Sequence, residues 1–235
     1  MISSLWRAAL AEFLGTGLLV AVVVGSGIAA QQLSPHDVGL QLLENSIATA
    51  LGLAVLILMF GPVSGAHFNP IVTLGDAVLG GRKWREVPVY LVAQFAGGIG
   101  GALLANAMFG IPTAFSTKDR ATPGHLLAEV VAAAILVLLI FLLARTGQTK
   151  AAPAAVGAYI GAAYWFTSST SFANPAVTIG RMFTDTFAGI APSSAPGFII
   201  AQVIGGAVGL GLLVLLVPAP RKRAEDAVVP ERTFL

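Results

Sequence analysis

The chain has 235 residues, of which 56% are apolar and only 10% are charged, and its mean hydropathy is +0.86. Soluble domains carry roughly 25% charged residues, so this composition excludes an ordinary soluble protein and indicates a polytopic membrane protein. The net charge of +2 gives no reason to expect a nucleic-acid partner, and the lack of cysteine excludes disulfides and thiol chemistry.

Six long apolar stretches follow one another along the chain. A membrane span needs ~20 apolar residues, which most of the stretches supply. The first one contains Glu12 and is longer than the roughly 7–15-residue core of a signal peptide, so we expect a first span there and not a cleaved leader. The expected spans are 8–30, 39–60, 87–109, 125–144, 153–167 and 197–217, of which the fifth is the shortest.

Two shorter apolar runs, near 69–79 and 174–184, each begin with an Asn-Pro pair, at Asn69 and Asn174. Asn is a favoured N-cap, and Pro fits the first helical turn because its missing N–H has no partner there in any case. A run of about ten residues cannot cross a membrane alone. We therefore expect two re-entrant half-helices whose N-termini line a cavity.

Three sequence marks recur in the same order in the second half of the chain. Each unit holds three spans and one half-helix, and an odd number of spans inverts the second unit in the membrane. The sequence therefore predicts one channel domain over 1–235, with repeats at about 8–109 and 125–217. The marks are Ala-Glu at Glu12 and Glu129, Asn-Pro at Asn69 and Asn174, and Ala-Gln at Gln94 and Gln202, at offsets of 117, 105 and 108 residues.

The basic residues predict the orientation, because cytoplasmic loops are enriched in Lys and Arg. With the N-terminus in the cytoplasm, ten basic residues lie inside and three outside. We expect a multi-pass protein of the cell inner (plasma) membrane with both termini, including a polar tail at 218–235, in the cytoplasm. The inside set is Arg7, Arg82, Lys83, Arg85, Arg145, Lys150, Arg221, Lys222, Arg223 and Arg232, and the outside set is Lys118, Arg120 and Arg181.

The opposed half-helices predict the chemistry of a pore centre. Each N-terminus carries roughly +0.5 of an elementary charge, so two facing N-termini disfavour cations and protons. Asn69 and Asn174 would present NH₂ donors to a passing solute, and the backbone before each would present carbonyl acceptors. Such a path suits small uncharged hydroxylic solutes. The predicted carbonyl residues are Gly65, Ala66, His67, Thr170, Ser171 and Phe172.

Glu12 and Glu129 lie inside apolar spans, where a charge needs partners. They are either a proton- or ion-coupling site or, as their matched positions favour, buried structural acceptors for loop N–H groups. His67 lacks a second metal ligand at workable spacing, so it is interpreted as hydrogen-bonded loop structure. The sequence indicates no metal, no cofactor and no enzymatic nucleophile–base pair.

The chain resembles the major intrinsic protein (aquaporin and aquaglyceroporin) family over about residues 8–217. The resemblance implies an all-α polytopic membrane protein with six transmembrane helices and two re-entrant half-helices in an inverted repeat. It also implies a homotetramer with one pore per subunit and passive transport of water, glycerol or similar neutral molecules across the lipid bilayer. The motifs are Ala11-Glu-Phe-Leu-Gly-Thr16, Ser64-Gly-Ala-His-Phe-Asn-Pro70 and Asn174-Pro-Ala176.

By that resemblance, a selectivity filter falls on Thr49, Ala162, Ser171 and Val177. Family members usually carry arginine where this chain has Val177, and water-selective members usually carry Phe and His where it has Thr49 and Ala162. The filter is therefore expected to be wide, short of donors and partly apolar. Arg181 is seven residues after Asn174, so it lies nearly on the same helix face but ~10 Å further out. It either lines the outer vestibule or, as we favour, is a snorkelling interface residue.

Such a filter is similar to those of bacterial aquaglyceroporin-like channels associated with arsenic resistance. The candidate solutes are therefore glycerol-like polyols, neutral As(OH)₃ or methylated arsenicals, and some water. The alternatives are a water-selective aquaporin, a coupled secondary transporter that uses Glu12 and Glu129, and a non-conducting structural membrane protein.

Overall fold

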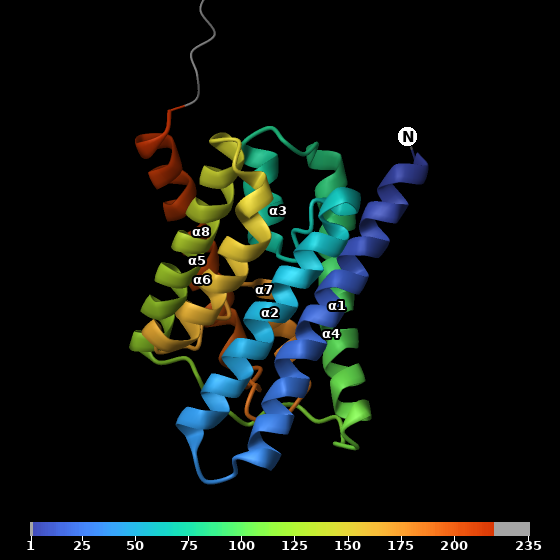
Figure 1. Ribbon diagram of the computed structural model, residues 1–235, viewed down its shortest axis with the longest axis vertical. Helices are drawn as coiled ribbons and strands as arrows, with labels where there is room; N and C mark the ends of the chain where they lie inside the picture. The colour runs from blue at the N-terminus through green and yellow to red at the C-terminus, as the bar shows by residue number, and fades with distance from the viewer. Residues whose placement is uncertain (1, 219–235) are drawn as a thin grey trace, which may run out of the picture.

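The computed structural model describes residues 2–218, and over this range the chain is built from helices and connecting loops (Figure 1). The tail predicted for 218–235 lies, apart from its first residue, outside the described residues. The α-helices are α1 (Ile2–Leu33), α2 (Val38–Ser64), α3 (Pro70–Val78), α4 (Val87–Met108), α5 (Pro123–Arg145), α6 (Ala152–Phe166), α7 (Pro175–Arg181) and α8 (Ala195–Leu216), and the 3₁₀-helices are η1 (Trp84–Glu86) and η2 (Thr149–Ala151).

Each of the six expected spans falls on one long helix. Five of them, α1, α2, α4, α5 and α8, have 22 to 32 residues and are apolar enough to cross a membrane. The fifth span, α6, has 15 residues, which is a rise of about 22 Å, and it continues directly from η2. The prediction that this span is the shortest is confirmed.

The two halves of the chain run in opposite senses. α1 descends from the end of the bundle that holds the N-terminus, here called the N-terminal end, whereas α5 rises toward it (Figure 1). In the first half α4 packs on α1, and in the second half α8 packs on α5. A Cβ added at Gly97 or Gly101 would lie 2.3 or 2.0 Å from a carbonyl oxygen of α1, and one at Gly205 or Gly209 would lie 2.3 or 2.4 Å from a carbonyl oxygen of α5. These glycines therefore allow the paired helices to touch backbone to backbone.

The half-helices α3 and α7 lie inside the bundle and begin at the predicted Asn-Pro pairs. The second ends at Arg181, three residues before the predicted limit, because the chain turns there with Phe183 N–H bonded to Gly180 O at 3.1 Å. The segment before each half-helix is irregular and contains non-glycine residues in the left-handed region, a conformation that costs of order 1–3 kcal/mol each. Those residues are Ala66, Phe68, Thr170, Ser171 and Ala173, with φ from 48° to 63°.

Candidate transport pathway

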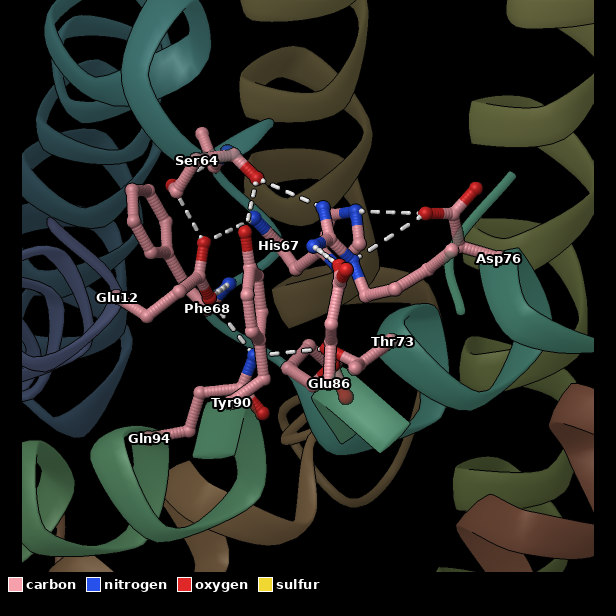
Figure 2. Close-up of polar contacts among 12 residues, drawn as sticks. Glu12, Ser64, His67, Phe68, Thr73, Asp76, Glu86, Tyr90 and Gln94 are labelled. Atoms are coloured by element: carbon pink, nitrogen blue, oxygen red, sulfur yellow. Dashed lines mark hydrogen bonds and ion pairs between the residues drawn. The ribbon is translucent and has the colours of Figure 1, made fainter. Parts of the chain in front are cut away.

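Glu12 organises the segment before α3. Its carboxylate is fully buried and accepts hydrogen bonds from the backbone N–H groups of His67 at 2.9 Å and Phe68 at 2.7 Å. It also accepts bonds from Ser64 Oγ at 2.6 Å and Gln94 Nε2 at 2.7 Å (Figure 2). Four donors, two of them main-chain groups that lack a helical partner, compensate for burying this carboxylate.

Glu129 repeats this arrangement in the second half. It is fully buried and accepts bonds from the N–H groups of Phe172 at 2.9 Å and Ala173 at 2.8 Å, from Ser169 Oγ at 2.6 Å and from Gln202 Nε2 at 2.6 Å. The same donor types in both halves explain why the two carboxylates recur in the sequence at matched positions.

Asn69 and Asn174 join the two half-helices at their N-termini. Asn69 Oδ1 accepts from Ile71 N–H at 3.0 Å, and Asn174 Oδ1 accepts from the first turn of α7 at 2.9 and 3.2 Å. Each NH₂ group crosses to the other half: Asn69 Nδ2 donates to Ala173 O at 2.8 Å, and Asn174 Nδ2 donates to Phe68 O at 2.7 Å. Because an amide has two N–H donors, each Asn keeps a second N–H for another acceptor.

A cavity of about 760 Å³ passes both Asn side chains and extends toward both ends of the bundle. At the N-terminal end its wall includes His67, Asp76 and Lys150, and toward the opposite end it includes Thr49 and Tyr164. Glu12 and Glu129 are absent from the described lining. The cavity therefore brings together polar groups of both halves without exposing the two buried carboxylates.

The predicted carbonyl residues lie mostly on this wall. Gly65, Ala66 and His67 from the first segment line the cavity, as do Ser171 and Phe172 from the second, whereas Thr170 is not among the described lining residues. Irregular backbone thus occurs inside the bundle where it borders the cavity, which is the setting in which a membrane protein tolerates it.

The predicted filter is assembled only in part. Thr49, Ser171 and Val177 line the cavity, but Ala162 is exposed on the opposite face of α6. Tyr164 lines the cavity in its place, with its hydroxyl 3.1 Å from Thr49 Oγ1. The assignment of Ala162 is therefore wrong for this wall, because the lining stripe of α6 includes Val156, Ile160 and Tyr164, spaced four residues apart.

Arg181 is also placed differently from the expectation. Its exposed fraction is only 2%, it lines the cavity, and its guanidinium carbon lies 3.4 Å from the centroid of the Phe172 ring. Its Nε donates to the carbonyl of Ala188. The interpretation of Arg181 as a snorkelling residue is wrong. The alternative expectation, that Arg181 lines the outer part of the path, fits better, because Arg181 is four residues after Val177 and shares its helix face.

His67 belongs to a polar network at the N-terminal end (Figure 2). Its Nδ1 lies 3.1 Å from Thr73 Oγ1, and its Nε2 lies 3.5 Å from a carboxylate oxygen of Asp76. Arg82 lies 3.6 Å from the same oxygen and stacks 3.8 Å from the ring centroid of Tyr90. In the described part of the chain, no group of three or more His, Asp or Glu side chains is arranged to hold a metal ion.

The two inverted halves bring two capped half-helices together inside an apolar bundle, and a cavity runs past their N-termini. This arrangement defines a multi-pass membrane channel and not an enzyme. The model of the family described as "Major intrinsic protein" matches residues 2–171, and the chain belongs to that family of membrane channels for small neutral solutes and water.

Its relatives include an aquaglyceroporin, AqpS of Rhizobium meliloti, with 51% identity over 92% of both chains. A glycerol uptake facilitator protein of Streptococcus pneumoniae is 32% identical over 87% of this chain and 95% of its own length. Among solved structures, the aquaglyceroporin of Plasmodium falciparum superposes with a TM-score of 0.69 at 22% identity, covering 91% of this chain and 97% of that one. These comparisons confirm the predicted family and fold class.

Proposed function

We propose that the chain is a passive channel for small uncharged solutes, principally glycerol-like polyols, with some passage of water. One observation carries the proposal: the cavity runs past two Asn side chains that each donate one N–H to a backbone carbonyl of the opposite half and keep a second N–H unused. Similarity to AqpS and to glycerol uptake facilitators supports a polyol among the solutes.

Asn69 and Asn174 act at the centre of the proposed path. A hydroxyl oxygen of the solute accepts their free N–H groups in turn, while carbonyls of the two irregular segments accept its hydroxyl protons. The positive ends of α3 and α7 meet at the same place and raise the energy of a cation or hydrated proton there. Neutral solutes cross because they carry no charge for the positive helix ends to repel.

The proposed outer filter consists of Thr49, Ser171, Val177 and Tyr164. Hydroxyl groups on three of the four supply donors and acceptors, and the Val177 side chain supplies an apolar face. A polyol presents both surfaces, oxygens on one side and C–H groups on the other. The same chemistry suits neutral As(OH)₃ and methylated arsenicals, which we include among the candidate solutes.

The fully bonded state of Glu12 and Glu129 favours a channel over a coupled transporter. Each carboxylate has four donors and lies outside the described cavity lining, so neither is placed to exchange a proton or ion with the path. We assign both a structural role, in which they hold the irregular segments that carry the Asn residues.

We further propose that the protein is a homotetramer in the plasma membrane, with both termini in the cytoplasm. Many large apolar side chains on the outer faces of the long helices are exposed, which suits contact with lipid and with neighbouring subunits. Under this orientation the N-terminal end of the bundle faces the cytoplasm, and Arg181 lies toward the outside.

A solute panel in proteoliposomes tests the proposal. Light scattering follows swelling or shrinkage with glycerol, urea, As(OH)₃ or an impermeant osmolyte that reports water flow. We expect glycerol to pass far faster than through protein-free liposomes. Passage of water alone would support a water-selective channel, and rates equal to bare lipid for every solute would refute the proposal.

A further inference from the structure

Arg181 places a cation in the wall of the pore. It is the last residue of α7, lines the cavity and is almost fully buried. No carboxylate of the described residues forms an ion pair with it. Burying a guanidinium without a counter-ion is expensive, so its position requires compensation from the cavity contents or from the neighbouring dipoles.

The bonds of Arg181 leave its distal nitrogens available. Nε is used by the carbonyl of Ala188, and one face of the guanidinium is covered by the Phe172 ring. No acceptor among the described residues is bonded to the two terminal NH₂ groups of Arg181. Neither terminal nitrogen is among the side-chain atoms that are completely buried and lack a hydrogen-bond partner. Four N–H donors therefore remain for a molecule in the cavity.

A second arginine fixes this orientation. Arg120 Nε donates to Gly189 O at 2.7 Å and its terminal nitrogen donates to Phe187 O at 3.0 Å, so the carbonyls on either side of Ala188 are also held. The segment that binds Arg181 is consequently anchored from the loop before α5. The Arg181 fork is preorganised, and ordering it costs little when a solute arrives.

An unpartnered hydroxyl also lines this cavity. Ser171 has an exposed fraction of 4%, and its Oγ has no hydrogen-bond partner among the described residues. The hydroxyl of Tyr164, which also lines the cavity, has only Thr49 Oγ1 as a bonded partner. A buried hydroxyl without a partner costs free energy that a solute oxygen would recover.

We propose that Arg181 is a selectivity-determining residue of the outer pore and that, with Ser171 and Tyr164, it forms a subsite for uncharged solutes with several acceptor oxygens. The guanidinium fork donates to two oxygens of one solute, and the hydroxyls exchange bonds with its remaining OH groups. The charge repels cations before they reach the Asn pair. This subsite rests on the proposed channel function.

The charge and the donors of Arg181 predict separate effects. A unit charge about 6 Å from a passing cation lowers its passage roughly 3-fold in a water-like medium and roughly 100-fold at an effective dielectric constant of about 20. We expect about tenfold. Loss of a hydrogen bond to an uncharged solute corresponds to about a fivefold lower rate.

These effects can be separated in proteoliposomes that contain wild type, Arg181→Met, Arg181→Lys or Arg85→Met. Arg85→Met is the control, because Arg85 is exposed and outside the cavity lining. Light scattering gives the glycerol-to-water permeability ratio, and an enclosed pH dye with clamped membrane potential gives proton entry. Arg181→Met should lower the ratio about fivefold and raise proton entry about tenfold. Arg181→Lys should restore proton exclusion but not the ratio, and Arg85→Met should match wild type.

A Ser171→Ala variant keeps the test decisive if Arg181→Met does not fold. It should lower the glycerol-to-water ratio without raising proton entry. If wild type conducts glycerol but both the ratio and proton entry are unchanged in the Arg181 variants, or fall equally for every solute, the subsite is refuted. If wild type itself passes no glycerol, the proposed function fails instead.

Discussion

Val177→Arg tests the proposed width of the outer filter. Val177 lines the cavity with an exposed fraction of 5%, so a longer side chain at this position has to enter the path. Arg181 lies four residues further along α7, which is about 6 Å along the helix axis. The substitution therefore adds both bulk and a second cation to one stretch of the pore.

The two cations repel each other by roughly 2.8 kcal/mol at about 6 Å and an effective dielectric constant of about 20, which drives the new side chain away from Arg181 and across the lumen. Steric discrimination in a close-fitting pocket amounts to roughly 1–3 kcal/mol for each extra methylene. A polyol meets this constriction with its whole width, whereas water does not. We expect the glycerol-to-water ratio to fall about tenfold.

Stopped-flow light scattering on proteoliposomes measures both permeabilities in one preparation. Val177→Met is the matched control, because it lengthens the side chain without adding charge or donors, and it should lower the ratio less. An equal loss for glycerol and water, or no loss for either, would refute the idea that Val177 borders a wide filter.

Four further substitutions, one of them a control, test the supporting structure. Glu129→Gln removes a carboxylate that accepts four bonds and should destabilise the fold by about 3–6 kcal/mol, visible as a lower Tm in detergent. Gly205→Val should abolish folding because even a Cβ would lie 2.3 Å from a carbonyl oxygen of α5. Gly211→Val should be tolerated in size-exclusion profiles, because a Cβ there would meet nothing within 4 Å apart from its chain neighbours and its own helix backbone. The hydrogen bond that Ser194 donates is the main cause that lowers the pKa of Asp119. The bond therefore stabilises the loop above pH ~3.8, and this stabilisation is lost as the pH falls through the lowered pKa. Ser194→Ala should raise the pKa of Asp119 in an NMR titration.

The sequence was most informative where local chemistry repeats. The caps at Asn69 and Asn174 and the matched carboxylates at Glu12 and Glu129 identify two related halves, since a half-helix needs its own cap and an irregular buried segment needs its own acceptors. An odd number of spans in each half then requires inversion. The inverted architecture follows from these few residues, and the motifs around them carry the resemblance to the family.

The outer filter was less predictable because it depends on how loops return to the bundle. The filter positions implied by the family resemblance placed Ala162 on the cavity wall, but the rotation of α6 presents Tyr164 instead. Arg181 was favoured as an interface residue because helix rise puts it ~10 Å beyond Asn174, although it lies nearly on the same helix face. The sequence contains no sign that the following loop folds back and presents the Ala188 carbonyl and covers the guanidinium.

The most direct test of a passive channel is the initial rate of glycerol entry into proteoliposomes, measured over a wide concentration range with and without an imposed proton gradient. We predict a rate that rises linearly with glycerol concentration and does not change with the gradient. A rate that saturates at low glycerol and requires the gradient would contradict the account and favour a coupled transporter.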